Sequence, residues 1–314
     1  MGSTQFGNFG DFCRDSTLPV CNLFVANNNP PNSAFQDGCA LVGIGVGGGD
    51  RLTNLGSILL AFIGIVLSLF LIWRSERKQA AVGRREMQIF LLGFIIIEIC
   101  EIFSVGGIPL RDDVRKGFSA VHIATIAAAS WVLFLNALVG FQFLDDGTPA
   151  SIGLFFVSAG AIFVGTGYIA LDTAFGWTSE FETTGPDYRN IALYVLYQLF
   201  PLVCLFAFFV LETYLVIRVL GEFRPMRKSS PTAEFQHLTY TVYLGAATIL
   251  FAIGQIFNYV ISTHLCHATG GKINGALFET LFTVLSVAML WYFWSSITED
   301  DWPMPMSQPM PGYN

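Results

Sequence analysis

The sequence predicts an all-α membrane protein, a polytopic bundle of seven transmembrane helices. Of its 314 residues, 53% are hydrophobic and only 12% are charged, whereas soluble domains carry about 25% charged residues. The mean hydropathy is +0.57, and 30 residues are phenylalanine, a side chain suited to contact with lipid. Seven apolar segments are each long enough to cross about 30 Å of hydrocarbon as a helix.

The seven predicted helices are joined by short loops that leave no room for a second folded domain. Lipid offers no hydrogen-bond partners, so helices are the expected form of each segment. The predicted helices span 52–73, 87–107, 118–141, 151–171, 190–217, 237–261 and 275–296. They divide the chain into an N-terminal tail at 1–51, a transmembrane domain at 52–296 and a C-terminal tail at 297–314. The C-terminal tail is acidic and proline-rich, and we expect it to be disordered.

Basic residues flank the first predicted helix unequally. Arg51 directly precedes it, whereas the loop 74–86 that follows contains Arg74, Arg77, Lys78, Arg84 and Arg85. The positive-inside rule therefore places this loop in the cytosol. An odd number of helices then puts the N-terminus in the lumen and the C-terminus in the cytosol. The chain begins without a basic stretch and an apolar core, so the first helix is expected to act as an uncleaved targeting signal.

The cysteines fit this orientation. Four of them fall on the predicted lumenal side, namely Cys13, Cys21, Cys39 and Cys266. Four cysteines in an oxidising compartment favour two disulfides, in one of three pairings. We expect at least one bond to join the N-terminal tail to the loop at Cys266, and such a bond would close a very long loop.

Two glutamates lie within the second predicted helix, in the stretch FIIIEICEIF at 94–103. Glu98 and Glu101 are three residues apart and so share one helix face. Each would cost several kcal/mol in contact with lipid, so we expect this face to turn inward. Asn136, Gln255 and Asn258 complete a set of five candidate intramembrane contact residues, and Glu212 and Glu279 are further acidic residues within the predicted helices. Three roles stay open: hydrogen bonds between helices, an ion or proton path, or contacts that hold polar groups on the membrane helices of a client.

Two further features concern helix shape. The fourth predicted helix contains Gly153, Gly160, Gly165 and Gly167, which would permit close approach of a neighbouring helix. Pro201 interrupts the fifth and is expected to kink it.

Several patterns that can indicate chemistry do not do so here. VGIGVGGGD at 42–50 contains G-x-G-x-x-G without the strand, soluble helix and later acidic residue of a dinucleotide site, so we interpret it as a flexible linker. His264, Cys266 and His267 are too few for a zinc site. The last predicted helix has no lysine that could bind retinal. The net charge of −7 gives no basic surface for nucleic acid. We therefore predict no enzyme activity, no metal and no cofactor.

The C-terminal tail carries a candidate sorting signal on the predicted cytosolic side. It consists of Glu299, Asp300, Asp301 and Trp302, and a vesicle-coat protein could read it. The alternative is a tail that only adds solubility.

Five segments resemble the fungal chitin synthase export chaperones. FGDFCRDSTLPVCNLF is similar to their N-terminal segment with L-P-x-C, and AVGRREM to their cytosolic loop with G-R-x-E. LDDGTPASI resembles their D-G-T turn, ISTHLCHATGGKINGALFETLF their S-T-x-x-C segment, and WSSITEDDW their acidic end. The segments run from residue 9 to residue 302, in matching places between apolar stretches.

The resemblance implies an endoplasmic-reticulum membrane protein that helps chitin synthase to fold, avoid aggregation and reach the cell surface, where it makes cell-wall chitin. It implies no catalytic residues, and it maps the family's four lumenal cysteines onto the four named above. The expected partners are chitin synthase, vesicle-coat cargo machinery and the lipid bilayer. Two rival hypotheses are a transporter that uses the buried carboxylates and a seven-helix receptor. The receptor would normally show an Asp-Arg-Tyr triplet after its third helix, and this sequence lacks one.

Overall fold

The computed structural model describes residues 6–24, 39, 41–47, 50–78, 81–143, 147–178, 180–181, 183, 188–223 and 231–298. In chain order its elements are α1 (Gly10–Asp15), the 3-10 helix η1 (Pro19–Phe24), β1 (Ile44–Gly47), β2 (Asp50–Leu52), α2 (Leu55–Glu76), α3 (Arg84–Ser104), α4 (Asp112–Gly140), α5 (Pro149–Phe175), α6 (Ile191–Leu193), the π-helix η2 (Tyr194–Leu199), α7 (Phe200–Phe223), α8 (Pro231–Ile256), the π-helix η3 (Phe257–Ile261), α9 (Ser262–Ala268) and α10 (Gly275–Ile297).

Seven helices in the described part of the chain are long and apolar enough to cross a membrane, which confirms the predicted fold class. They are Leu55–Glu76, Arg84–Ser104, Asp112–Gly140, Pro149–Phe175, Ile191–Arg218, Tyr240–Ala268 and Gly275–Ile297. Helices α3 and α4 begin several residues before their apolar segments. Their first turns carry charged residues, so a search for apolar runs misses these turns.

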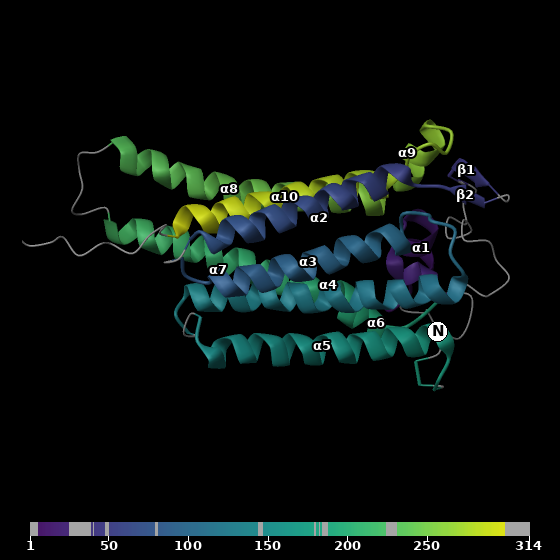
Figure 1. Cartoon of the computed structure of the whole chain (residues 1–314), viewed down its shortest axis with the longest axis horizontal. Helices are drawn as coiled ribbons and strands as arrows, with labels where there is room; N and C mark the ends of the chain where they lie inside the picture. The colour runs from purple at the N-terminus through teal and green to yellow at the C-terminus, as the bar shows by residue number, and fades with distance from the viewer. Residues whose placement is uncertain are drawn as a thin grey trace, which may run out of the picture.

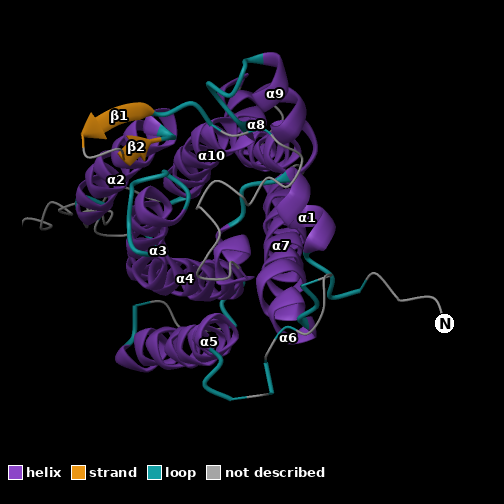
Figure 2. Ribbon diagram, turned by 90° about the vertical axis from the view of Figure 1, so that its right-hand side faces the viewer, coloured by secondary structure: helices purple, strands orange, loops and turns teal. Residues whose placement is uncertain are grey.

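Helix α4 is the centre of the bundle. It packs against α3, α5 and α7, while α2 packs against α3 and α10, and α10 against α8. The end-on view shows α5 on the outside of this arrangement, next to α4 (Figure 2). The side chains of α4 are accordingly more buried than those of any other predicted span. The third hydrophobic segment of the sequence is therefore the core helix of the protein.

The described part of the N-terminal tail packs against one end of the bundle. Helix η1 contacts α4 and α5, and α1 lies near η3. Phe9, Val20 and Leu23 are buried there with residues of α4 and α5 in a second, smaller hydrophobic core. Asn22 Nδ2 donates to Ser104 O and to Ser119 Oγ, each at 2.9 Å, and so holds the tail to α3 and α4. Figure 1 shows α1, the β-hairpin and α9 together at this end, called the disulfide end below.

The glycine-rich stretch does not form the flexible linker that we expected. Its described residues form a two-stranded antiparallel hairpin in which Ile44 pairs with Leu52 and Gly45 with Arg51. Gly47 has a backbone φ of +100°, which residues other than glycine rarely adopt. A glycine at this position lets the chain turn back into β2. Glycine richness was therefore misread as flexibility.

The expectation for the glycines of the fourth span was mostly wrong. A Cβ added at Gly153, Gly160 or Gly165 would meet no atom within 4 Å, whereas one at Gly167 would lie 3.5 Å from Ala124 Cβ on α4. Only Gly167 therefore lies at a close helix contact, because α5 faces α4 on one side and leaves its other side free. In the fifth span, Pro201 is the second residue of α7, just after the π-helical turn η2, and both proline and π-helical turns are common where helices bend.

Glu86 connects two loops at the end opposite the disulfides. Its side chain is fully buried, and its Oε1 accepts hydrogen bonds from Gly147 N at 3.3 Å and Ser151 Oγ at 3.5 Å. Gly147 has a φ of +63° and precedes the N-cap residue Thr148 of α5. The segments AVGRREM and LDDGTPASI, separate in the sequence, thus meet at one carboxylate. This contact fixes the start of α3 against the start of α5.

Replacing Glu86 with alanine is expected to destabilise the protein by about 1–3 kcal/mol, because a fully buried acceptor is lost and the buried Ser151 hydroxyl stays unpaired. Glu86→Gln keeps an acceptor oxygen and should lose less. Thermal unfolding of the purified protein in mild detergent measures the difference. An alanine variant that melts with the native protein would contradict the role given to Glu86.

Candidate functional site

Four of the five predicted intramembrane contact residues line one cavity of about 580 Å³: Glu98, Glu101, Gln255 and Asn258. The cavity lies between α3, α4, α7, α8 and α10. Because residues from five helices converge on it, its lining forms only when the bundle is assembled. Glu98 and Glu101 do share one inward face, and both are less than one-tenth exposed.

Asn136, the fifth predicted contact residue, lies elsewhere. Its Oδ1 would be 3.0 Å from a Cβ added at Gly83, at the end opposite the disulfides. Glu212 is also buried outside the cavity lining, near Gly140 of α4. These two residues therefore belong to helix packing, and the sequence alone did not separate them from the cavity residues.

Glu98 and Glu101 form the acidic wall of the cavity on α3. Glu101 Oε2 lies 3.7 Å from His122 Nε2 on α4, and Thr280 lines the same cavity from α10. Glu98 packs against α2 at Gly64, where an added Cβ would lie 3.1 Å from Glu98 Cδ. The absence of a side chain at Gly64 therefore leaves room for the Glu98 carboxyl inside the bundle.

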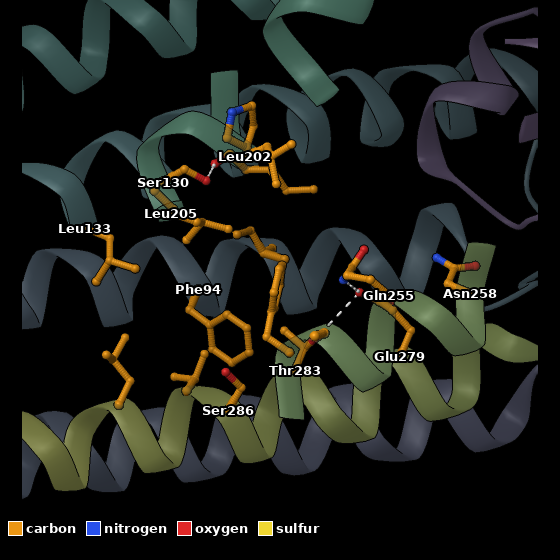
Figure 3. A pocket seen from close by; sticks show the side chains of 18 of the residues that line it. Phe94, Ser130, Leu133, Leu202, Leu205, Gln255, Asn258, Glu279, Thr283 and Ser286 are labelled. Atoms are coloured by element: carbon orange, nitrogen blue, oxygen red, sulfur yellow. Dashed lines mark hydrogen bonds between the residues drawn. The ribbon is translucent and has the colours of Figure 1, made fainter. Parts of the chain in front are cut away.

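A third carboxyl, Glu279, faces the same space from α10. Its Oε1 accepts hydrogen bonds from Gln255 Nε2 at 3.5 Å and from Thr283 Oγ1 at 3.4 Å (Figure 3). Gln198 and Tyr259 also line the cavity and are paired with each other. Gln198 Nε2 lies 2.9 Å from the Tyr259 hydroxyl, and that hydroxyl lies 3.1 Å from Gln198 Oε1. Polar groups of α3, η2, α8, η3 and α10 thus gather in one part of the cavity.

The remaining part of the cavity is mainly apolar; Ser130 and Ser286 also lie there, and their hydroxyls donate to the carbonyls of Ile126 and Ala247 (Figure 3). Figure 3 shows Phe94, Leu133 and Leu205 on one side, away from Gln255 and Asn258. Phe90, Leu244, Phe208 and Leu290 also line the cavity. Its two parts therefore differ in chemistry, one rich in hydrogen-bonding groups and one hydrocarbon-like.

The cavity reaches the outer surface between α7 and α8. Leu202 and Phe206 on α7 line it, yet their side chains are 62% and 68% exposed. Thr248 and Ala252 on α8 likewise line the cavity and are exposed. In a bilayer these four residues lie at hydrocarbon depth, so this opening would face lipid.

The N-terminal tail covers the cavity at the disulfide end. Thr17, Leu18 and Pro19 line it there, within the chain ring closed by the Cys13–Cys21 disulfide. The cover therefore belongs to the segment FGDFCRDSTLPVCNLF. Because Leu18 and Pro19 are buried, this end of the cavity is closed by apolar side chains.

The second disulfide joins Cys39 to Cys266, which are separated by 227 residues in the sequence. Cys266 is fully buried in α9. A backbone hydrogen bond of 2.7 Å from Val42 N to Gly271 O runs beside it. The tail before α2 is thereby attached to the connection between α9 and α10. Cys100 and Cys204 are free and buried within the bundle.

Sequence reasoning missed part of the cavity. His122 carries no signal in the sequence, because it lies near the start of the predicted helix 118–141, whereas α4 begins six residues earlier at Asp112. Gln198, Tyr259 and the cover at 17–19 carried no signal, because their role depends on which helices become neighbours. The candidate sorting signal, Glu299, Asp300, Asp301 and Trp302, lies outside the described residues. Within the described part of the chain, no group of three or more His, Cys, Asp or Glu side chains is placed to hold a metal ion.

Comparisons with known proteins agree over almost the whole chain. Residues 5–308 match the family model described as chitin synthase export chaperone. The chain is 27% identical to the chitin synthase export chaperone of Coccidioides immitis, over 95% of this chain and 84% of the relative. It is 26% identical to that of Cryptococcus neoformans, over 95% of this chain and 76% of the relative. It is also 27% identical to the chitin synthase export chaperone of Chaetomium globosum, over 94% of this chain and 83% of the relative. With matching segments on both sides of its seven helices, the chain belongs to the chitin synthase export chaperone family.

Proposed function

We propose that this protein is a membrane chaperone that helps chitin synthase to fold and leave the endoplasmic reticulum for the cell surface, in support of cell-wall chitin synthesis. The observation that carries the proposal is the family match over residues 5–308. Relatives of the same name align over most of their own length. The family favours this function over transport through the bundle. No catalytic step is part of the proposal.

The physical basis of the proposal is the behaviour of polar groups in lipid. A membrane enzyme with many helices exposes unpaired polar groups until its helices have packed, and lipid cannot satisfy them. A pre-assembled bundle can bind such a client transiently and reduce wrong association. Glu98 and Glu101 face inward, so a direct contact with a client would require the client to place a hydrogen-bond donor in the cavity.

Location and orientation are part of the proposal. We place the protein in the endoplasmic-reticulum membrane with the disulfide end in the lumen and the loop 74–86 in the cytosol. Two observations support this orientation: the basic residues around the first helix, and two disulfides at one end of the bundle, which an oxidising compartment would maintain. The C-terminal tail then reaches the cytosol, where residues 299–302 can serve as a signal for vesicle-coat cargo machinery.

Deletion of the chaperone tests the proposed function. In fungal cells that express a fluorescent chitin synthase, the enzyme should accumulate in the endoplasmic reticulum and cell-wall chitin should fall several-fold. An unrelated multi-pass plasma-membrane protein serves as the control and should still reach the surface. Normal delivery of every chitin synthase in the deletion strain would contradict the proposal. Arrest of the control protein as well would replace it with a general role in export.

A further inference from the structure

The cavity contains hydrogen-bond acceptors without partners. They are Glu98 Oε2, Glu101 Oε1 and Asn258 Oδ1, and each atom is shielded from solvent. All three side chains are more than nine-tenths buried and line the cavity. Buried polar atoms in folded proteins are nearly always paired. Because these three acceptors belong to side chains that line one cavity, a ligand with hydrogen-bond donors would find partners there.

The described lining of the cavity supplies no lysine or arginine cation to these acceptors. His122 Nδ1 lies 2.9 Å from Ser104 Oγ, so that nitrogen is already paired. Thr280 Oγ1 donates to its own helix at Ala276 O. With three carboxyls, Glu98, Glu101 and Glu279, the cavity suits a cation and disfavours a phosphate or a carboxylate.

The volume of the cavity decides what kind of molecule fits. A membrane-spanning helix is about 10 Å wide and 30 Å long, or roughly 2,400 Å³, which far exceeds the cavity's 580 Å³. The cavity has the usual size of a small-molecule site, about 300–1,000 Å³. A client helix therefore cannot enter, whereas one lipid chain with a compact head can.

The arrangement of the lining also fits an amphiphile. Polar groups gather near Gln255 and Asn258, and the apolar part extends toward Phe94 and Leu133 (Figure 3). The opening between α7 and α8 leads from this space to the lipid. A molecule that diffuses in the bilayer can enter there tail or head first, without crossing water.

We propose that this cavity binds a single-chain membrane amphiphile with a protonated amine head. The ammonium group donates hydrogen bonds to Glu98, Glu101 and Asn258. The alkyl chain lies along the apolar part, toward Phe94 and Leu290. This inference does not depend on the export function, because binding is measured on the isolated protein.

Competition between three molecules with the same tail tests the proposal. The full-length protein is placed in nanodiscs of neutral phosphatidylcholine and labelled with a photoreactive C18 amine, and the labelled residues are identified by mass spectrometry. Labels should fall on α7, α8 and α10 within the cavity. Octadecylamine should compete at least tenfold better than octadecanol or octadecanoic acid. Labels outside the cavity, or equal competition by the alcohol or the acid, would overturn the proposal.

Matched variants separate binding in the cavity from binding elsewhere. Thr248→Trp narrows the opening and should reduce labelling at least fivefold, whereas Ile249→Trp, the next residue, is 61% exposed outside the cavity and should not. The double variant Glu98→Gln/Glu101→Gln should bind octadecylamine at least tenfold more weakly. Glu212→Gln changes a buried carboxyl outside the cavity lining and should leave the affinity for octadecylamine unchanged. Unchanged labelling in Thr248→Trp would refute the lateral route and the site together.

Discussion

Replacing Cys39 and Cys266 together with alanine is expected to lower the free energy of unfolding by about 2–5 kcal/mol. The bond joins residues 227 positions apart, and the chain-entropy model assigns about 5 kcal/mol to so long a loop. Membrane insertion already restricts the unfolded chain, so the measured loss should fall below that value. Thermal unfolding of the native and variant proteins in the same detergent gives the measurement.

The Cys13–Cys21 bond provides the matched control for this experiment. Its cysteines are only eight residues apart, for which the same model gives about 2.5 kcal/mol. Its removal should cost less stability and should mainly loosen the cover at Thr17–Pro19. If the Cys39/Cys266 variant and the native protein unfolded at the same temperature, the long-range bond would have no structural importance.

Gly275→Ala is the second change with a large expected effect. Gly275 begins α10, and an added Cβ would overlap the carbonyl oxygen of Phe257 and lie 2.8 Å from Ser262 Cβ. The Gly275 N–H donates to Ser262 Oγ at 3.0 Å, so the start of α10 cannot move away from the start of α9 without losing this hydrogen bond. Because backbone atoms are involved, we expect a loss of about 3 kcal/mol, at the upper end of overpacking costs.

Gly160→Ala is the matched control for Gly275→Ala. Its added methyl group meets no atom within 4 Å on α5, and alanine in a helix is about 0.5–1 kcal/mol more favourable than glycine. It should melt at the native temperature or slightly above it. If Gly275→Ala also melted at the native temperature, the close contact between α10 and η3 would be contradicted.

The sequence predicted the number and type of helices because hydrocarbon thickness sets their length. It also predicted that Glu98 and Glu101 face inward, since lipid penalises exposed carboxylates. It could not separate Asn136 from Gln255 and Asn258, because their positions depend on which helices are neighbours. It misjudged the stretch at 42–50, where one glycine with positive φ forms a turn. The sequence could not predict that residues 17–19 cover the cavity either, because long-range packing leaves no periodic pattern.

The Cys39–Cys266 bond also sets an order of events during biosynthesis. Cys39 leaves the ribosome 227 residues before its partner, which at 5–20 residues per second is a delay of about 10–45 s. Throughout that interval the Cys39 thiol cannot take its final partner and must stay reduced or form a temporary mixed disulfide. Closure of the bond therefore marks completion of nearly the whole membrane insertion. Formation of this bond, which needs an oxidant, is therefore a late step in the protein's own maturation.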